Sequence, residues 1–194
     1  MKQNKSFLGR WLSCCVLLLL AGCATTPSHP DYTSQQMDFS AVRSVAVLPF
    51  LNLSSDDQAG ERVRDAFMGM LLATEAIYVL PPGEVARGTN LVGMRTPETP
   101  TIEEITKFLD LLEVDAIITG VLREYGPVRS GSAEANLLSL SLQMSETQTG
   151  TTVWSASSTK GGISMSDRML GSGGQPMNDV TIEAINDLLD QLFE

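Results

Sequence analysis

Two segments of this chain would present apolar side chains on both faces of a β-strand. They are residues 45–50, VAVLPF, and residues 116–122, AIITGVL. Strands of this composition are typical of sheets that are covered on both faces, as in α/β proteins. We therefore expect the chain to cover its sheet with its own helices on both sides, or to leave one face to a neighbouring protein.

An amphipathic helix is predicted over residues 57–73, because apolar side chains recur there at the spacing of one helical face. The charged residues fall on the other face, namely Glu61, Arg62, Arg64 and Asp65. Ser55 and Gln58 fit a capping box at its start, and the neighbouring Asp56 and Asp57 suit the positive end of the helix dipole.

Two further helices and one turn are predicted. Thr101 and Glu104 fit a second capping box, which starts a helix that buries Ile105, Phe108, Leu109 and Leu112. The last helix covers residues 180–193. Residues 82–88 predict a single helical turn that is closed by Gly88.

Strands are predicted over residues 44–50, 76–80 and 114–126, followed by a hairpin over residues 133–158. Polar and apolar residues alternate along the hairpin, so one face is expected to be exposed to water. The other face carries Leu138, Leu140, Leu142, Met144, Trp154 and Ala156. The order β-α-β-α-β-β-β-α predicts a single α/β (α+β) domain with a mixed five-stranded sheet and about three packed helices. Right-handed crossovers make the first three strands parallel.

The amino terminus has the features of a secretory signal. Lys2, Lys5 and Arg10 precede an apolar run over residues 11–20. That run is shorter than the roughly 20 residues a membrane-spanning helix needs.

The end of this signal, LAGC at residues 20–23, resembles the lipobox of bacterial lipoproteins. The resemblance implies diacylation of the Cys23 thiol, cleavage before Cys23 and acylation of the new amino terminus. The predicted organisation is a signal peptide over residues 1–22, a lipidated cysteine and flexible tether over residues 23–40, and a periplasmic domain over residues 41–194. Two or three acyl chains anchor a protein durably in a membrane.

Cleavage leaves Cys23 as the only cysteine, so no disulfide or thiolate nucleophile remains in the domain. It also leaves 10 basic and 23 acidic residues. A nucleic-acid partner is excluded, because binding it requires a cationic face. The residue after Cys23 is Ala24 rather than aspartate. By resemblance to lipoprotein sorting, this favours the outer membrane.

No catalytic, metal or cofactor site is predicted. The one histidine, His29, lies in the tether, and the domain offers no Cys or His for zinc. Ser157 and Lys160 are close enough for serine–lysine chemistry, but Lys160 precedes two glycines and is expected to be an ordinary exposed lysine. The acidic pair at residues 103–104 lies at a helix start, where carboxylates are expected for the dipole alone.

The glycine-rich residues 161–179 contain three methionines, Met165, Met169 and Met177. Methionine side chains are adaptable and are common at binding surfaces. They are therefore candidate partner contacts, and the alternative is that they fill the edge of the core.

The order of VAVLPF, the polar loop NLSSDD, the strand DAIITGVLREYG and the strand GTTVWSASS resembles a known superfamily. It unites the TolB amino-terminal domain, the curli-secretion lipoprotein CsgG and the penicillin-binding-protein activator LpoB. The chain is still more similar to the small TolB-N-like outer-membrane lipoproteins known as neisserial vaccine antigens. The resemblance covers residues 42–194 and implies the fold, with no catalytic motif to transfer.

These features predict a non-enzymatic lipoprotein, anchored to the outer membrane through the lipid on Cys23 and facing the periplasm. It would act as an adaptor or accessory subunit of an envelope machine for transport, assembly or wall synthesis, with a protein partner there. The first alternative is a CsgG-like homo-oligomeric secretion subunit. The second is an envelope enzyme that acts on glycan or peptide.

Overall fold

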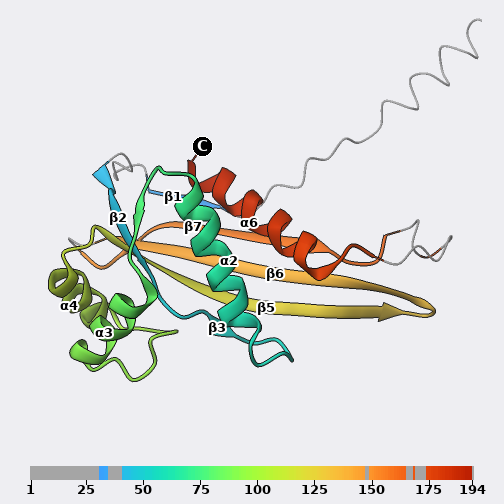
Figure 1. The fold of residues 1–194 in the computed structure, drawn as a ribbon, viewed down its shortest axis with the longest axis horizontal. Helices are drawn as coiled ribbons and strands as arrows, with labels where there is room; N and C mark the ends of the chain where they lie inside the picture. Colours follow the sequence, from blue (N-terminus) through green and yellow to red (C-terminus); the bar gives the residue numbers. More distant parts are fainter. Residues whose placement is uncertain (1–30, 35–40, 147–148, 165–167, 169–173, 194) are drawn as a thin grey trace, which may run out of the picture.

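The computed structural model describes residues 31–34, 41–146, 149–164, 168 and 174–193 (Figure 1). Its one sheet has seven strands in the order β1-β7-β6-β5-β2-β4, and β3 also pairs with β5. The strands are β1 (Tyr32–Thr33), β2 (Ser44–Val47), β3 (Leu51–Asn52), β4 (Tyr78–Val79), β5 (Ala116–Ser130), β6 (Ala133–Glu146) and β7 (Thr152–Gly161). The helices of this part of the chain are α2 (Ala59–Ala73), α3 (Pro82–Val92), α4 (Ile102–Leu112) and α6 (Met177–Phe193).

The predicted fold class is confirmed, because one mixed sheet is packed against helices. β4, β2 and β5 are parallel, as expected, and β5, β6 and β7 are antiparallel. The predicted count of five strands is wrong. Three of the seven strands, β1, β3 and β4, are only two residues long. β4 lies within a predicted apolar strand, whereas β1 and β3 were not predicted because two residues cannot produce a hydrophobic period.

Helices of the chain itself cover both faces of the doubly apolar strands. α2 and α6 pack on one face, over a core that includes Val45, Val47 and Ile118. α3 and α4 pack on the other, over Ala46 and Ile117. The alternation of these residues between two separate clusters explains why neither strand segment shows a polar face in its sequence.

α3 is a full helix rather than the single turn that was predicted, and it brings the number of described helices to four. Gly88 lies inside it, not at its end. A Cβ at Gly88 would lie 2.6 Å from Leu112 Cδ1, so the glycine allows α3 and α4 to approach closely. The helix ends instead at Gly93, whose φ of 80° is left-handed.

The hairpin of β6 and β7 alternates as predicted. Leu138, Leu140, Leu142, Met144, Trp154 and Ala156 are all buried. The other face remains partly exposed and consists mainly of small polar side chains, including Ser139, Ser141, Gln143, Ser155 and Ser157.

Residues 31–34 lie within the segment for which the sequence predicts a tether. Tyr32 and Thr33 form β1 and pair with Ser155 and Trp154 at the edge of β7. Both side chains are exposed, so backbone pairing holds this strand in place. The signal peptide, Cys23 and His29 lie outside the described residues. No helix among those described is long and apolar enough to cross a membrane.

Asp115 joins the start of β5 to β2. Its Oδ2 accepts hydrogen bonds from Arg43 N at 2.9 Å, from Ser44 N at 3.0 Å and from Ser44 Oγ at 3.0 Å. Desolvation by partial burial acts to raise the pKa of this carboxyl, but these hydrogen bonds outweigh it. The net pKa of Asp115 therefore lies below its ordinary value.

A depressed pKa stabilises the fold above the unfolded pKa of aspartate, about 3.9, and this contribution is lost as pH falls through the folded pKa. Asp115→Asn should therefore lower the free energy of unfolding at pH 7 by about 1 kcal/mol. At pH 3 the two proteins should differ less. Urea unfolding at both pH values measures this, with Asp110→Asn, at an exposed position of α4, as the charge-matched control. If Asp115→Asn lowered the free energy of unfolding equally at both pH values, the stabilising role of the charged carboxylate would be contradicted.

Candidate functional site

The residues suggested by sequence for serine–lysine chemistry lie on opposite faces of β7. Lys160 lies on the face of β7 that meets α6, where its Nζ is 3.1 Å from Asp187 Oδ1. The neighbouring Ser158, on the same face, donates from its Oγ to Asp187 Oδ2 at 2.5 Å. Ser157 lies on the other face, in register with Ser141. Lys160 is therefore not the ordinary exposed lysine that was expected, because its side chain is only 21% exposed and is paired with Asp187.

The acidic residues near helix starts have separate structural roles. The capping box of Thr101 and Glu104 is confirmed: Thr101 Oγ1 accepts from Glu104 N, and Glu104 Oε2 accepts from Thr101 N at 2.8 Å. The box predicted for Ser55 and Gln58 is wrong, since α2 begins at Ala59 and the Gln58 side chain makes no cap. No cluster of three or more metal-ligating side chains occurs in the part of the chain that is described.

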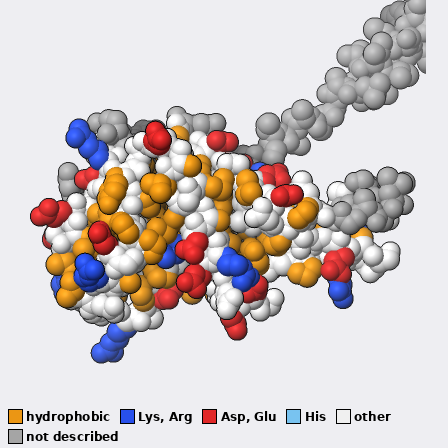
Figure 2. Space-filling model, in the orientation of Figure 1, with side chains coloured by type: hydrophobic (Ala, Val, Ile, Leu, Met, Phe, Trp, Pro, Cys, Tyr) orange, Lys and Arg blue, Asp and Glu red, His pale blue; other side chains and the backbone are white. Residues whose placement is uncertain are grey.

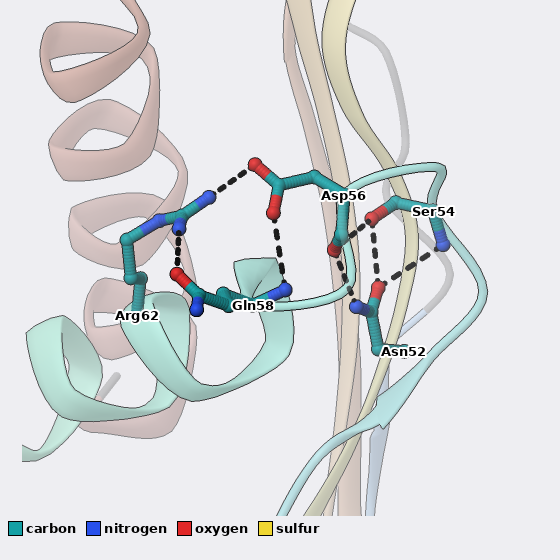
Figure 3. Close-up of polar contacts among 5 residues, drawn as sticks. All are labelled: Asn52, Ser54, Asp56, Gln58 and Arg62. Carbon is teal, nitrogen blue, oxygen red and sulfur yellow. Dashed lines mark hydrogen bonds and ion pairs between the residues drawn. The ribbon is translucent and has the colours of Figure 1, made fainter.

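A polar network shapes the loop between β3 and α2 instead (Figure 3). Asn52 Oδ1 accepts from Ser54 N and Oγ, and Asn52 Nδ2 donates to the Asp56 carbonyl at 2.7 Å. Asp56 Oδ1 in turn accepts from Gln58 N at 3.0 Å. Asn52 therefore holds the loop before α2, and Asp56 accepts from the N-cap residue Gln58, in place of the capping box that the sequence predicted for Ser55.

Arg62 connects this loop to the long strand β5. Its guanidinium pairs with Asp56 and Gln58, and it lies 5.5 Å from the centre of the Tyr125 ring. Hydrogen bonds to Tyr125 and Asp56 raise the pKa of Arg62. The contact fixes the start of α2 against β5 at the point where β5 leaves the body of the domain.

A pocket of about 450 Å³ opens beside the first turns of α2. Its apolar lining includes Phe50, from the segment that joins β2 to β3, and Leu51, the first residue of β3, and Arg64 lines the pocket from α2. The sequence placed Arg64 on the exposed face of the helix. It is instead 9% exposed, because its Nε and Nη2 donate to the Val47 carbonyl at 3.1 and 2.6 Å. Its position next to Val63 on the apolar stripe was the available signal.

The hairpin of β5 and β6 extends beyond its neighbours and forms an arm (Figure 1). β7 reaches only to Leu137 of β6, and β3 only to Leu122 of β5, so within the described part of the chain residues 126–136 pair only with each other. An ion pair of 2.6 Å between Arg129 Nε and Glu134 Oε2 crosses the arm near its tip. Two-stranded ribbons are marginal in water, which makes this arm a candidate for contact with a partner.

The segment before α6 supports the base of the arm. Asn136 Nδ2 donates to the Gln175 carbonyl at 2.8 Å, and a Cβ at Gly174 would lie 2.5 Å from Ala135 Cβ. Met177, one of the three candidate contacts, is half-buried and packs against the main core. Met165 and Met169 lie outside the described residues.

Hydrophobic side chains also gather on the face that carries α2, α3 and α4 (Figure 2). The large apolar side chains exposed on these helices and on β4 are Leu72, Tyr78, Leu91, Ile102 and Leu111. Single exposed apolar residues are common on protein surfaces. The arm is the more specific candidate, because beyond its base its two strands pair with no other strand among the described residues.

Comparison with known proteins places these features in a family. A family model described as "Putative lipoprotein GNA1162-like" matches residues 30–193. No curated protein gives a significant sequence match to the chain.

Solved structures share the fold at low sequence identity. The dodecamer of PelC from Paraburkholderia phytofirmans is 12% identical, with a TM-score of 0.57, covering 85% of this chain and 96% of that one. The lipoprotein GNA1162 from Neisseria meningitidis is 18% identical, with a TM-score of 0.56, covering 77% and 97%. The hypothetical protein CT253 from Chlamydia trachomatis is 12% identical, with a TM-score of 0.53, covering 78% and 96%. The family match and the second structure confirm the resemblance to small neisserial lipoproteins.

Proposed function

We propose, because the chain belongs to the GNA1162-like lipoprotein family, that it is a lipid-anchored accessory protein of a bacterial envelope machine. The lipid on Cys23 holds it at the outer membrane with the domain in the periplasm. It acts there as a non-enzymatic adaptor for transport, assembly or wall synthesis. Confinement to a membrane raises its effective concentration near a partner, which is the mechanism of tethered modules.

The observation that carries the adaptor role is the projecting arm of β5 and β6. Tyr32 of β1 pairs with Ser155 of β7. Because Tyr32 lies nine residues after Cys23, this part of the sheet stays within about 30 Å of the lipid. Along β5, Ser130 at the tip lies 11 residues beyond Thr119, which is in register with that position. At about 3.3 Å per residue the tip is roughly 35 Å away. The arm thus extends from the tethered end of the sheet.

A second candidate function is a subunit of a homo-oligomeric ring, as in a secretion assembly. It is favoured by the shared fold with PelC, whose structure is a dodecamer. In a ring the arm would contact the next copy of the chain rather than a different protein.

The adaptor and the ring are separated by photo-crosslinking in intact cells. A photoreactive residue replaces Val128 on the arm, and a matched probe replaces Leu111, an exposed apolar residue on α4. The adaptor predicts that the Val128 probe captures one envelope protein, identified by mass spectrometry, which the Leu111 probe does not.

A ladder of self-crosslinks from Val128 would support the ring and exclude the adaptor. Equal labelling from both positions, or none from either, would contradict both assignments of the arm.

A further inference from the structure

The charge of Arg64 is buried without a counter-ion. Its two hydrogen bonds go to a neutral carbonyl, that of Val47, and none of the ion pairs among the described residues includes it. The remaining nitrogen, Nη1, makes no hydrogen bond within the described part of the chain, and the side chain lines the pocket beside α2. Burial lowers the pKa of this guanidinium, partly offset by Asp65 and Glu61. A buried cation of this kind is costly unless an acceptor reaches it.

Three carboxylates line the same pocket. Glu61 and Arg64, three residues apart on α2, lie on one face of the helix, Asp57 belongs to the loop just before it, and Glu98 comes from the segment between α3 and α4. None of the three carboxylates makes a hydrogen bond or ion pair with another residue whose position is described. The pocket thus combines one cation with three anions, all of them available to a ligand.

This charge arrangement discriminates between classes of ligand. A simple anion would pair with Arg64 but would be repelled by three carboxylates, and a simple amine would leave Arg64 unpaired. A molecule with one carboxylate and two ammonium groups satisfies both. The volume, about 450 Å³, lies in the range of small-molecule pockets, and Phe50 and Leu51 offer apolar wall for a methylene chain.

We propose that this pocket binds a diamino acid, whose carboxylate pairs with Arg64 and whose ammonium groups pair with Glu61, Glu98 and Asp57. This inference does not depend on the proposed adaptor function. A lysine at the carboxyl end of a peptide offers the same carboxylate and side-chain ammonium, but its α-nitrogen is an uncharged amide, whereas a free diamino acid offers both ammonium groups.

The test is equilibrium dialysis of radiolabelled L-lysine against the lipidated full-length protein in detergent, with unlabelled competitors. L-lysine should bind saturably at one site per chain. Cadaverine and lysinamide, which lack the carboxylate, should compete about tenfold less well, as expected for the loss of one charged hydrogen bond. Competition by cadaverine equal to that of L-lysine would show that Arg64 takes no part and would overturn the proposal.

Glu61→Gln and Glu98→Gln test the other half of the site without disturbing the bond from Arg64 to Val47. Each should weaken L-lysine binding about tenfold. Asp65→Asn is the control, because it removes the same charge beside Arg64 on α2 but does not line the pocket. It should leave binding unchanged, and an equal loss in all three variants would contradict the site.

The dipeptide alanyl-lysine distinguishes the two sources. Tighter binding of L-lysine supports a free diamino acid, and equal binding supports the carboxyl-terminal residue of a peptide. An absence of saturable binding by both in the millimolar range would overturn the proposal.

Discussion

Replacing Cys23 with serine should abolish acylation and leave the protein as an unprocessed precursor outside the outer membrane. The reason is that the lipobox proposed at residues 20–23 would direct acylation to the Cys23 thiol, and cleavage before residue 23 would follow that step. Each buried CH₂ of an acyl chain contributes about 0.8 kcal/mol to membrane binding, and two or more chains give durable anchoring. Metabolic labelling with an alkyne fatty acid, the mobility of the chain and membrane fractionation measure the three effects.

Cys14 and Cys15 provide the matched control. Both leave with the predicted signal peptide, so their replacement by serine should change neither the acyl label nor the mature mass. Retention of the label by Cys23→Ser would contradict the predicted lipidation site.

Phe67→Ala should cost the domain about 3–5 kcal/mol, the range for removing a buried aromatic side chain. Phe67 is fully buried where α2 packs on the sheet, and its ring centre lies 6.2 Å from that of Phe50. Such a loss is a large part of the 5–15 kcal/mol that stabilises a typical domain. Urea unfolding, followed by far-ultraviolet circular dichroism, measures it.

Two variants of α2 bracket this result. Phe67→Leu retains most of the buried volume and should cost less than about 1.5 kcal/mol. Leu72→Ala changes a side chain that is 57% exposed on the same helix and should stay within about 0.5 kcal/mol of the wild type. A Phe67→Ala variant as stable as Leu72→Ala would contradict the packing of α2 on the sheet.

The strands and helices that the sequence predicts best are those whose hydrophobic pattern repeats over many residues. The alternation from Leu138 to Met144 and the helical spacing in residues 57–73 both reflect how these elements pack, so their faces were predictable. β1 and β3 were missed because two residues cannot show a period. α3 was underestimated because Gly88 signals a helix end in sequence but is needed here for contact with Leu112.

The candidate sites were harder to predict, because they depend on contacts between distant residues. The position of Arg64 next to Val63 was a local signal of its burial, but its hydrogen-bond acceptor, the Val47 carbonyl 17 residues away, could not be predicted from a local pattern. Lys160 is paired because α6 brings Asp187 to β7. The arm was not predicted, because the expected hairpin was that of β6 and β7 and the strand before it was expected to end at Gly126, whereas β5 continues to Ser130 and pairs with β6.

The most direct measurement of the central proposal is the yield of the crosslink from Val128 in the wild type and in Cys23→Ser, at matched abundance. If the lipid acts by raising the effective concentration of the arm at a partner in the outer membrane, the wild type should capture that partner. Cys23→Ser should then capture at least about a hundredfold less. An equal yield from both proteins would show that anchoring does not deliver the arm to its partner, and would contradict the proposed function.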